Sequence, residues 1–278
     1  MSGSNWTPVD RTDFRKLRDA RLLAHYAVQW LARFARGTLP AQPRDGQTGL
    51  VWDEGFGGLS TQPLPDGTRL GLRVADLTLA VLGGARQTLP LDGRADPEVR
   101  AWLGGVLATR GLDAGKLDAP LPYDMPPHVL ALSARYAIEE LIEPLQALAV
   151  WFADASGLLG SVQQGLVKQR LKAPPVRCWP RHFDSDTLVP LGGDRFVGAG
   201  FSPGDEFCDE PYFYISIYPE PYIPALPLLP PVGHWHSYKF IAALAPAHKI
   251  VASLDQRADV AGFFDVSIGA ALAALATR

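Results

Sequence analysis

The chain has little sulfur, with 2 cysteines and 2 methionines among its 278 residues. So few cysteines exclude a disulfide-stapled secreted scaffold and favour a reducing compartment, so we expect a cytoplasmic protein. Cys178 and Cys208 each flank a block of polar residues. We interpret both as small packing residues, and metal ligation or a catalytic thiol is the alternative.

The chain also lacks an excess of either charge, because 26 lysines and arginines face 29 aspartates and glutamates. A general nucleic-acid binder needs a basic field to displace counterions, so that class is excluded. No uncharged apolar run reaches the roughly 18 residues of a membrane helix. Residues 1–10 carry no secretory or lipidation signal. We therefore expect neither a nucleic-acid partner nor a membrane partner.

What is present is the composition of a folded protein, 47% hydrophobic and 20% charged. Apolar residues three and four positions apart predict helices, and so does Asp96-Pro97, a cap residue followed by a first-turn proline. Alternation of apolar with smaller or polar residues predicts strands. Helices are predicted over residues 11–36, 96–110, 128–153 with Pro144 as a kink or break, 157–172 and 259–276. Strands are predicted over residues 58–64, 69–81 with a bulge at Ala75-Asp76, 187–191, 194–201, 212–218 and 235–243.

Strand blocks separated by long helices, without regular alternation, favour an α+β fold over a parallel doubly wound one. We predict two pseudo-repeated halves, each an antiparallel sheet with helices packed on one face. The predicted boundaries are an N-terminal scaffold half over residues 1–112, a linker over 113–126 and a C-terminal half over 127–278 that carries the candidate site.

Weak internal repetition supports this division. Trp52 and Leu64 have the same spacing as Trp179 and Leu191, and LDGRAD recurs as LDQRAD before a helix in each half. The second half carries extra residues between these blocks, and they include EPYFY and HWH. Where the second half has a histidine and an aspartate in HFD, the first has glycines, so the duplication hypothesis assigns the chemistry to the second half.

The blocks HFD and HWH each place two polar side chains two positions apart. Residues at this spacing on a strand point to the same side, as His182 and Asp184 would, and as His234 and His236 would. Such a pair can chelate zinc, iron or manganese, with His234, His236 and His182 as the predicted ligands. It can equally serve acid–base catalysis. An ordinary exposed strand explains each block taken alone.

Two further blocks lie between them. SPGD is typical of a tight turn that presents Asp205 outward, at the start of an acidic run that ends at Glu210. EPYFYISIYP alternates, with tyrosines on one face and aliphatic residues on the other. We predict Tyr212, Tyr214, Asp205 and Trp179 as substrate-binding residues, because tyrosines offer flat apolar area with hydroxyl donors. We predict His182, Asp184 and Glu210 as catalytic.

The motifs CWPRHFD, GFSPGD, EPYFYISIYP and GHWH, in this order, resemble an uncharacterised bacterial family, one of the domains of unknown function. Blocks of Trp-Pro-His-His-Phe-Asp, Ser-Pro-Gly-Asp, Glu-Pro-Tyr-Phe-Tyr and Gly-x-Trp-His recur in that family. The resemblance covers the second half strongly and the first half loosely, through QWLAR, LVW and RLGLRVADLTL. The resemblance implies a family relationship but no particular activity, since the family has no assigned activity. One departure is Arg181, where the family has the first histidine of its pair.

These observations lead to three hypotheses. The first is a metal-dependent or His/carboxylate acid–base enzyme that acts on a small molecule, in a hydrolase or lyase type of reaction. The second is a non-catalytic binding module with a tyrosine-lined pocket for a small molecule or peptide. The third is a purely structural polar network that ties the proline-rich residues 219–231 to the sheet.

Overall fold

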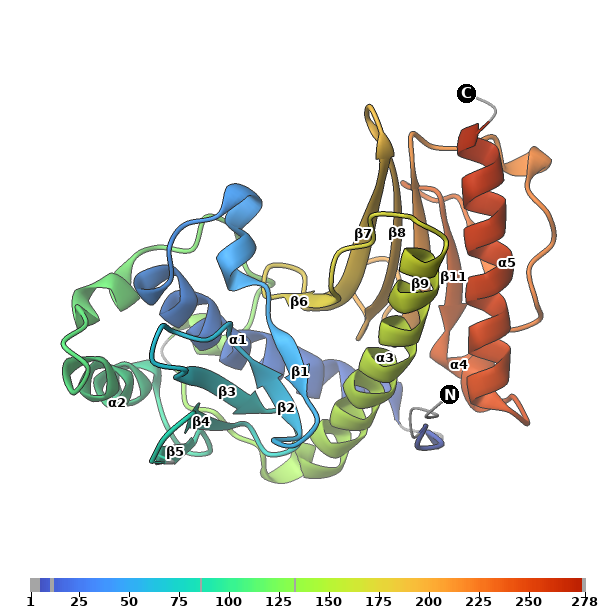
Figure 1. The fold of residues 1–278 in the computed structure, drawn as a ribbon. Helices are drawn as coiled ribbons and strands as arrows, with labels where there is room; N and C mark the ends of the chain where they lie inside the picture. The colour runs from blue at the N-terminus through green and yellow to red at the C-terminus, as the bar shows by residue number, and fades with distance from the viewer. Residues whose placement is uncertain (1–5, 11–12, 86, 133, 277–278) are drawn as a thin grey trace. The chain divides into compact units, whose positions relative to one another are not determined.

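The computed structural model describes residues 6–10, 13–85, 87–132 and 134–276, and Figure 1 shows its elements. The chain divides into two compact units. We call Thr12–Ala149 with Cys178–Phe183 the N-terminal unit, and Met1–Arg11 with Val150–Arg177 and Asp184–Arg278 the C-terminal unit. One antiparallel sheet has five strands and the other six, and helices accompany both, so the predicted α+β class is confirmed.

The N-terminal unit is a strand meander with helices before and after it. Its sheet has the order β1-β2-β3-β4-β5, and every neighbouring pair is antiparallel. Its helices are α1 (Phe14–Thr38), η1 (Pro43–Thr48), α2 (Asp96–Ala108), η2 (Ala114–Asp118), η3 (Val129–Leu132) and η4 (Glu139–Leu141). Its strands are β1 (Val51–Asp53), β2 (Gly58–Ser60), β3 (Arg69–Arg73), β4 (Thr78–Leu82) and β5 (Gln87–Pro90).

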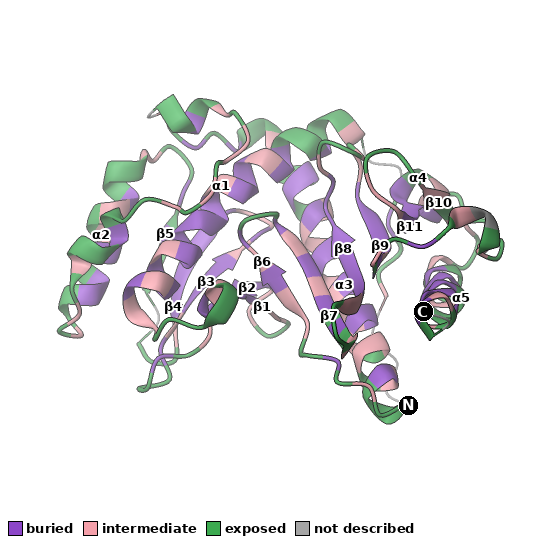
Figure 2. Ribbon diagram, turned by 90° about the horizontal axis from the view of Figure 1, so that it is seen from above, coloured by how far each residue is buried: buried purple, intermediate pink, exposed green. Residues whose placement is uncertain are grey.

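The helix α1 forms much of the core of this unit. Asp13 caps it, because its Oδ1 accepts a hydrogen bond from the Arg15 amide at 2.9 Å. The predicted start at residues 11 and 12 lies outside the described residues. Figure 2 shows α1 buried along much of its length, whereas α2 buries one side and exposes the other. The amphipathic pattern of α2 therefore matches a surface helix.

The phase change at Ala75-Asp76 is a hairpin turn and not the predicted bulge. The segment predicted as a single strand over residues 69–81 forms β3 and β4, which pair with each other. Leu77 has a φ of 47° in the turn, and the Asp76 carboxylate accepts from the Thr78 amide at 3.2 Å. A short aspartate side chain that bonds to the backbone two residues on stabilises such a turn.

The C-terminal unit contains the longer strands. Its sheet has the order β10-β11-β9-β8-β7-β6. The strands are β7 (Asp184–Gly192), β8 (Arg195–Ser202), β9 (Tyr212–Tyr218), β10 (His234–His236) and β11 (Ala242–Pro246), and the edge strand is β6 (Arg177–Trp179), whose Cys178 and Trp179 belong to the N-terminal unit. The helices are α3 (Ile142–Lys168), which begins in the N-terminal unit, η5 (Ile223–Ala225), α4 (Ala247–Val251) and α5 (Gln256–Ala276).

The helix α3 differs from its prediction at both ends. The described residues between 128 and 141 include two 3-10 turns, η3 and η4, and an isolated bridge from Arg135 to Ala95. The regular helix starts at Ile142 and continues through the predicted gap to Lys168. Pro144 therefore lies in the first turn, where its missing N–H costs no helical hydrogen bond. The proline marks the beginning of α3 and not a kink within it.

Aromatic side chains join the helices of the C-terminal unit to one face of its sheet. Trp151 of α3 lies 6.1 Å from Phe201 of β8, measured between ring centroids, and Phe264 of α5 lies 5.8 Å from Phe213 of β9. All four rings are buried. Figure 1 shows α5 running alongside this sheet. Burying each such side chain contributes about 2–3 kcal/mol, so this face is the core of the unit.

Two helices are long and apolar enough to cross a membrane by length and composition. They cover Glu139–Lys168 and Gln256–Ala276, with mean hydropathies of 1.3 and 1.6. A core helix passes the same test, and both helices supply the buried aromatics described above. The expectation of no membrane partner stays a prediction.

Candidate functional site

The alternation predicted for β9 is confirmed. Phe213, Ile215 and Ile217 are buried, and Tyr214 and Ser216 are half-exposed on the other side. Directly paired residues of neighbouring strands share a face, so the register extends this second side across the sheet. We call it the tyrosine face; it consists of His234, His236, Ala242, Leu244, Tyr212, Tyr214, Ser216, Gly198, Gly200, Ser202, Asp184 and Asp186.

A hydrogen bond on the tyrosine face joins β9 to β7 across the intervening strand β8. The Tyr214 hydroxyl donates to Asp184 Oδ2 at 2.7 Å. Tyr214 is paired with Gly200 of β8, and a Cβ at that glycine would lie 2.3 Å from Tyr214 Cζ. The absence of a side chain at Gly200 therefore lets the phenol lie over β8 and reach the aspartate.

The other oxygen of Asp184 has no partner. Asp184 Oδ1 is buried, and no donor in the described part of the chain bonds to it. Burial raises the pKa of Asp184 to about 6, while the Tyr214 hydrogen bond opposes that rise and the nearby Asp205 adds to it. The pKa of Tyr214 is raised well above its ordinary value by burial and by Asp184, so the phenol keeps its proton. This carboxyl group can gain or lose a proton near neutral pH.

Asp205 is held against the tyrosine face and does not point outward as predicted. Its Oδ2 accepts from the Tyr212 hydroxyl at 2.5 Å, and its Oδ1 accepts from the amides of Phe207 and Cys208 at 2.8 and 3.0 Å. The predicted turn is present, since Gly204 has a φ of 108°. Because the aspartate caps its own loop, the turn folds the carboxylate back toward β9. The Tyr212 and Tyr214 rings lie 6.0 Å apart.

Glu210, one of the predicted catalytic residues, pairs with His248, which is not among the predicted site residues. The glutamate accepts from the His248 amide at 2.7 Å and lies 2.6 Å from its Nδ1. The contact arises because β11 pairs with β9, which brings the first turn of α4 beside the residue that precedes β9. Only strand register could have revealed it. Both carboxylate oxygens of Glu210 are therefore occupied.

Cys208 packs against a small apolar cluster on the same face, made by Tyr212, Ala242 and Leu244, with Tyr214 and Phe240 beside it. Burial raises the pKa of its thiol to about 11. A thiol that stays protonated is a poor nucleophile, so the packing interpretation fits this residue.

The HWH block forms β10, in which His234 and His236 lie on the same side of the strand, as predicted. The predicted strand over residues 235–243 is instead two strands, β10 and β11, joined by a turn in which Lys239 has a φ of 64°. His236 Nε2 lies 2.7 Å from the Tyr238 carbonyl oxygen, and its ring centroid lies 4.5 Å from that of Phe240. Burial lowers the pKa of His234, and Lys249 adds to this effect.

The predicted metal site does not fit these positions. In the part of the chain that the structure describes, no group of three or more histidine, cysteine, aspartate or glutamate side chains is placed to hold a metal ion. Zinc, iron and manganese sites need three or four such ligands. The acid–base alternative needs no such group of ligands.

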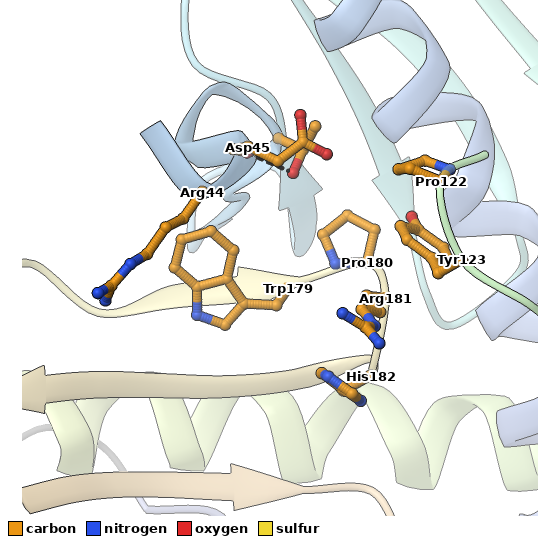
Figure 3. A pocket seen from close by; sticks show the side chains of 9 residues that line it. Arg44, Asp45, Pro122, Tyr123, Trp179, Pro180, Arg181 and His182 are labelled. Atoms are coloured by element: carbon orange, nitrogen blue, oxygen red, sulfur yellow. Dashed lines mark hydrogen bonds between the residues drawn. The ribbon is translucent and has the colours of Figure 1, made fainter. Parts of the chain in front are cut away.

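Trp179 and His182 belong to the N-terminal unit, unlike the other predicted site residues. Both line a pocket there, which Figure 3 shows. The segment that carries them is held by Cys178, which exchanges two backbone hydrogen bonds of 2.9 Å with Leu50. The structure brings four of the predicted residues together as two hydrogen-bonded pairs, Tyr214 with Asp184 and Tyr212 with Asp205, and the two tyrosine rings lie 6.0 Å apart.

Fold and site define an α+β protein with two antiparallel sheets and a tyrosine–carboxyl face on the second. No family model, no curated protein and no solved structure matches the chain. The functional conclusion therefore rests on the geometry.

Proposed function

We propose that the tyrosine face is an acid–base site that acts on a small molecule, in a hydrolase or lyase type of reaction. Asp184 is the group that transfers the proton. The supporting observation is its carboxyl group, with a pKa of about 6, one oxygen bound by Tyr214 and the other buried without a partner. A general acid or base works best when its pKa lies near the working pH.

The hydrogen bond from Tyr214 also selects the reactive atom. Because the phenol occupies Oδ2, only Oδ1 remains to exchange a proton. A buried acceptor without a partner costs about 1–3 kcal/mol, and a bound proton or a ligand that donates to it relieves that cost. The Tyr214 ring supplies flat surface beside this carboxyl group, and the Tyr212 ring lies 6.0 Å from the Tyr214 ring.

A non-catalytic binding module is the second candidate, and a specific observation favours it. The carboxylates of Asp205 and Glu210 already have hydrogen-bond partners on both oxygens, which is the condition of structural acids. In this version the tyrosine face holds a ligand without turnover.

The proposal is tested first by an activity screen of the full-length protein against esters, phosphomonoesters and hydroxy acids. Asp184→Asn should lower turnover by about a hundredfold or more, since acid–base groups contribute about 10²–10⁴. Asp194→Asn is the matched control, because this aspartate is exposed in the turn after β7. Equal turnover in Asp184→Asn would contradict the catalytic role, and binding without turnover would support the second candidate.

A second measurement needs no substrate. An NMR titration of the aspartate carboxyl carbons should assign to Asp184 a pKa near 6, and a value near 4 would remove the basis of the proposal. Membership in the uncharacterised bacterial family and a cytoplasmic location are proposed with it, on the sequence blocks and the cysteine content.

A further inference from the structure

The N-terminal unit contains a pocket that the proposed function does not use. Its volume is about 580 Å³, and it is lined by residues of three segments, 44–48, 122–123 and 179–182. Pockets for small ligands commonly have volumes of about 300–1,000 Å³. The size therefore suits a small organic molecule.

One wall of the pocket is fixed by buried side chains of α1. The Pro180 carbonyl oxygen lies 2.8 Å from His25 Nε2 and accepts from Gln29 Nε2 at 2.8 Å. Gln29 Oε1 in turn accepts from the Tyr123 hydroxyl at 2.8 Å. Burial lowers the pKa of His25 to about 4, so the imidazole is neutral and its Nε2–H donates to Pro180. This network connects two of the three lining segments, so the wall exists before any ligand binds.

The charge on the lining is positive. Arg44 and Arg181 lie on it with His182, and within the described residues neither guanidinium forms an ion pair. The one carboxylate on the lining, Asp45, is already bound to Arg36 and also accepts from Gln47 at 2.6 Å. Two guanidinium groups are thus left to bind an anion.

The backbone at the rim is strained. Arg44 and Asp45 have φ angles of 55° and 60°, in the left-handed region that few residues other than glycine adopt. Such a conformation costs about 1–2 kcal/mol per residue. It directs Asp45 to Arg36, and in the view of Figure 3 the Trp179 indole lies between the Arg44 side chain and the Arg181 side chain.

The remaining surface is aromatic and flat. Trp179 is half-buried on the lining, and Tyr123 is held by Gln29 while the Arg36 guanidinium lies 5.3 Å from its ring centroid. Indole and phenol rings bind planar groups by stacking, and arginines bind carboxylates or phosphates with two parallel hydrogen bonds.

We propose that this pocket binds a small planar organic anion, whose ring packs on Trp179 and whose acidic group is attracted by the positive charges of Arg44 and Arg181 on either side of that ring. A carboxylate and a phosphate monoester share this chemistry. The proposal involves none of the tyrosine-face residues, so it can fail or hold independently of the proposed enzyme activity.

Isothermal titration calorimetry on the full-length protein tests this directly. Benzoate and phenyl phosphate are the probes, and benzyl alcohol and inorganic phosphate lack the charge and the ring respectively. We expect at least one aromatic anion to bind about tenfold more tightly than either incomplete probe, and the tighter of the two identifies the acidic group. Equal binding of benzyl alcohol, equal binding of inorganic phosphate, or no binding at millimolar concentration would overturn the proposal.

Variants locate the binding. Arg181→Gln and Arg44→Asn should each weaken binding about tenfold or more, because a charge-assisted hydrogen bond contributes about 1.5–3 kcal/mol. Asparagine is chosen at position 44 since it tolerates a positive φ. Arg257→Ala is the control, an exposed arginine of α5 outside the pocket. Unchanged affinity in the two pocket variants, or an equal loss in Arg257→Ala, would contradict the assignment.

Discussion

In each of the two sheets, a side chain of one strand passes the neighbouring strand and bonds to an aspartate on the next strand. The bonding group is a guanidinium in one sheet and a phenol in the other. In the N-terminal sheet Arg69 of β3 reaches Asp53 of β1 at 2.7 Å, past Ser60 of the intervening strand β2. In the C-terminal sheet Tyr214 of β9 reaches Asp184 of β7 past the intervening strand β8. The first aspartate meets a cation that offsets its charge, and the second meets a neutral phenol that does not.

The difference matters for Asp184. A neutral phenol does not offset the desolvation of this carboxyl group, and burial raises its pKa to about 6. The N-terminal sheet is a meander, whereas in the C-terminal sheet β11 lies between β9 and β10; each sheet follows a helix and is followed by another. The shared order of helix, strands and helix agrees with the duplication hypothesis, although Asp53 and Asp184 are not equivalent positions in it.

The largest predicted effects are opposite pH dependences of the two units. The folded pKa of Asp184 is above its ordinary value, so its contribution to stability is present at low pH and lost as pH rises from about 4 to about 6. The folded pKa of His25 is lowered to about 4, so its contribution is lost as pH falls from about 6.5 to about 4. Each contributes up to about 3 kcal/mol.

Urea unfolding of the Asp184→Asn and His25→Gln variants between pH 4 and pH 7 measures these two pH dependences of stability. Relative to the parent, Asp184→Asn should gain stability as pH rises, and His25→Gln should lose it. Asp154→Asn serves as a control, because burial raises the pKa of Asp154 to about 6 as well, and this variant should change the slope but not turnover. Slopes of the same sign in the Asp184 and His25 variants would refute the comparison.

An intermediate effect is expected from alanine substitutions at two sheet glycines. A Cβ at Gly200 would lie 2.3 Å from the Tyr214 ring, so Gly200→Ala should cost about 1–3 kcal/mol of unfolding free energy. A Cβ at Gly71 would lie 2.7 Å from Phe56 Cε1, an atom at the edge of a rotatable ring, so Gly71→Ala should cost less. Gly160→Ala in α3 meets nothing within 4 Å and should be neutral or stabilising. A larger cost at Gly71 than at Gly200 would contradict this ranking.

The smallest effect on stability should come from removing the ion pair between Arg69 and Asp53. Asp53→Asn should lower the unfolding free energy by less than about 1 kcal/mol, because the Arg69 and Asp53 side chains are 34% and 21% exposed. The difference should shrink further in 0.5 M salt, since partly exposed pairs are screened. A loss above 2 kcal/mol in denaturation curves would show that this pair carries more of the sheet than its exposure implies.

Features set by nearby residues could be predicted from the sequence. The alternation of β9, the turn before Asp205 and the helix after Asp96 each depend on local spacing and backbone preference. The start of α3 was misplaced because Pro144 suits a first turn as well as a kink.

The site contacts could not be predicted in the same way. Tyr214 and Asp184 are 30 positions apart, and Glu210 and His248 are 38 apart, so each contact depends on strand register. The bond between Tyr214 and Asp184 also requires Gly200, which has no chemistry of its own. The pocket in the N-terminal unit joins three segments, and its rim residue Arg44 gave no sequence signal because its function depends on a left-handed backbone.

The short segment Cys178–Phe183 belongs to the N-terminal unit, while the residues on both sides of it belong to the C-terminal unit. No single cut of the gene can therefore separate the two units. A cut after Ala149 removes Trp179 and Pro180 from the pocket, and a cut after Phe183 leaves Val150–Arg177 attached to the N-terminal unit. During synthesis, residues 12–149 leave the ribosome well before this segment does. His25 and Gln29 therefore cannot bond to the carbonyl oxygen of Pro180 until that segment has emerged. Completion of the N-terminal unit is thus tied to translation of the C-terminal one.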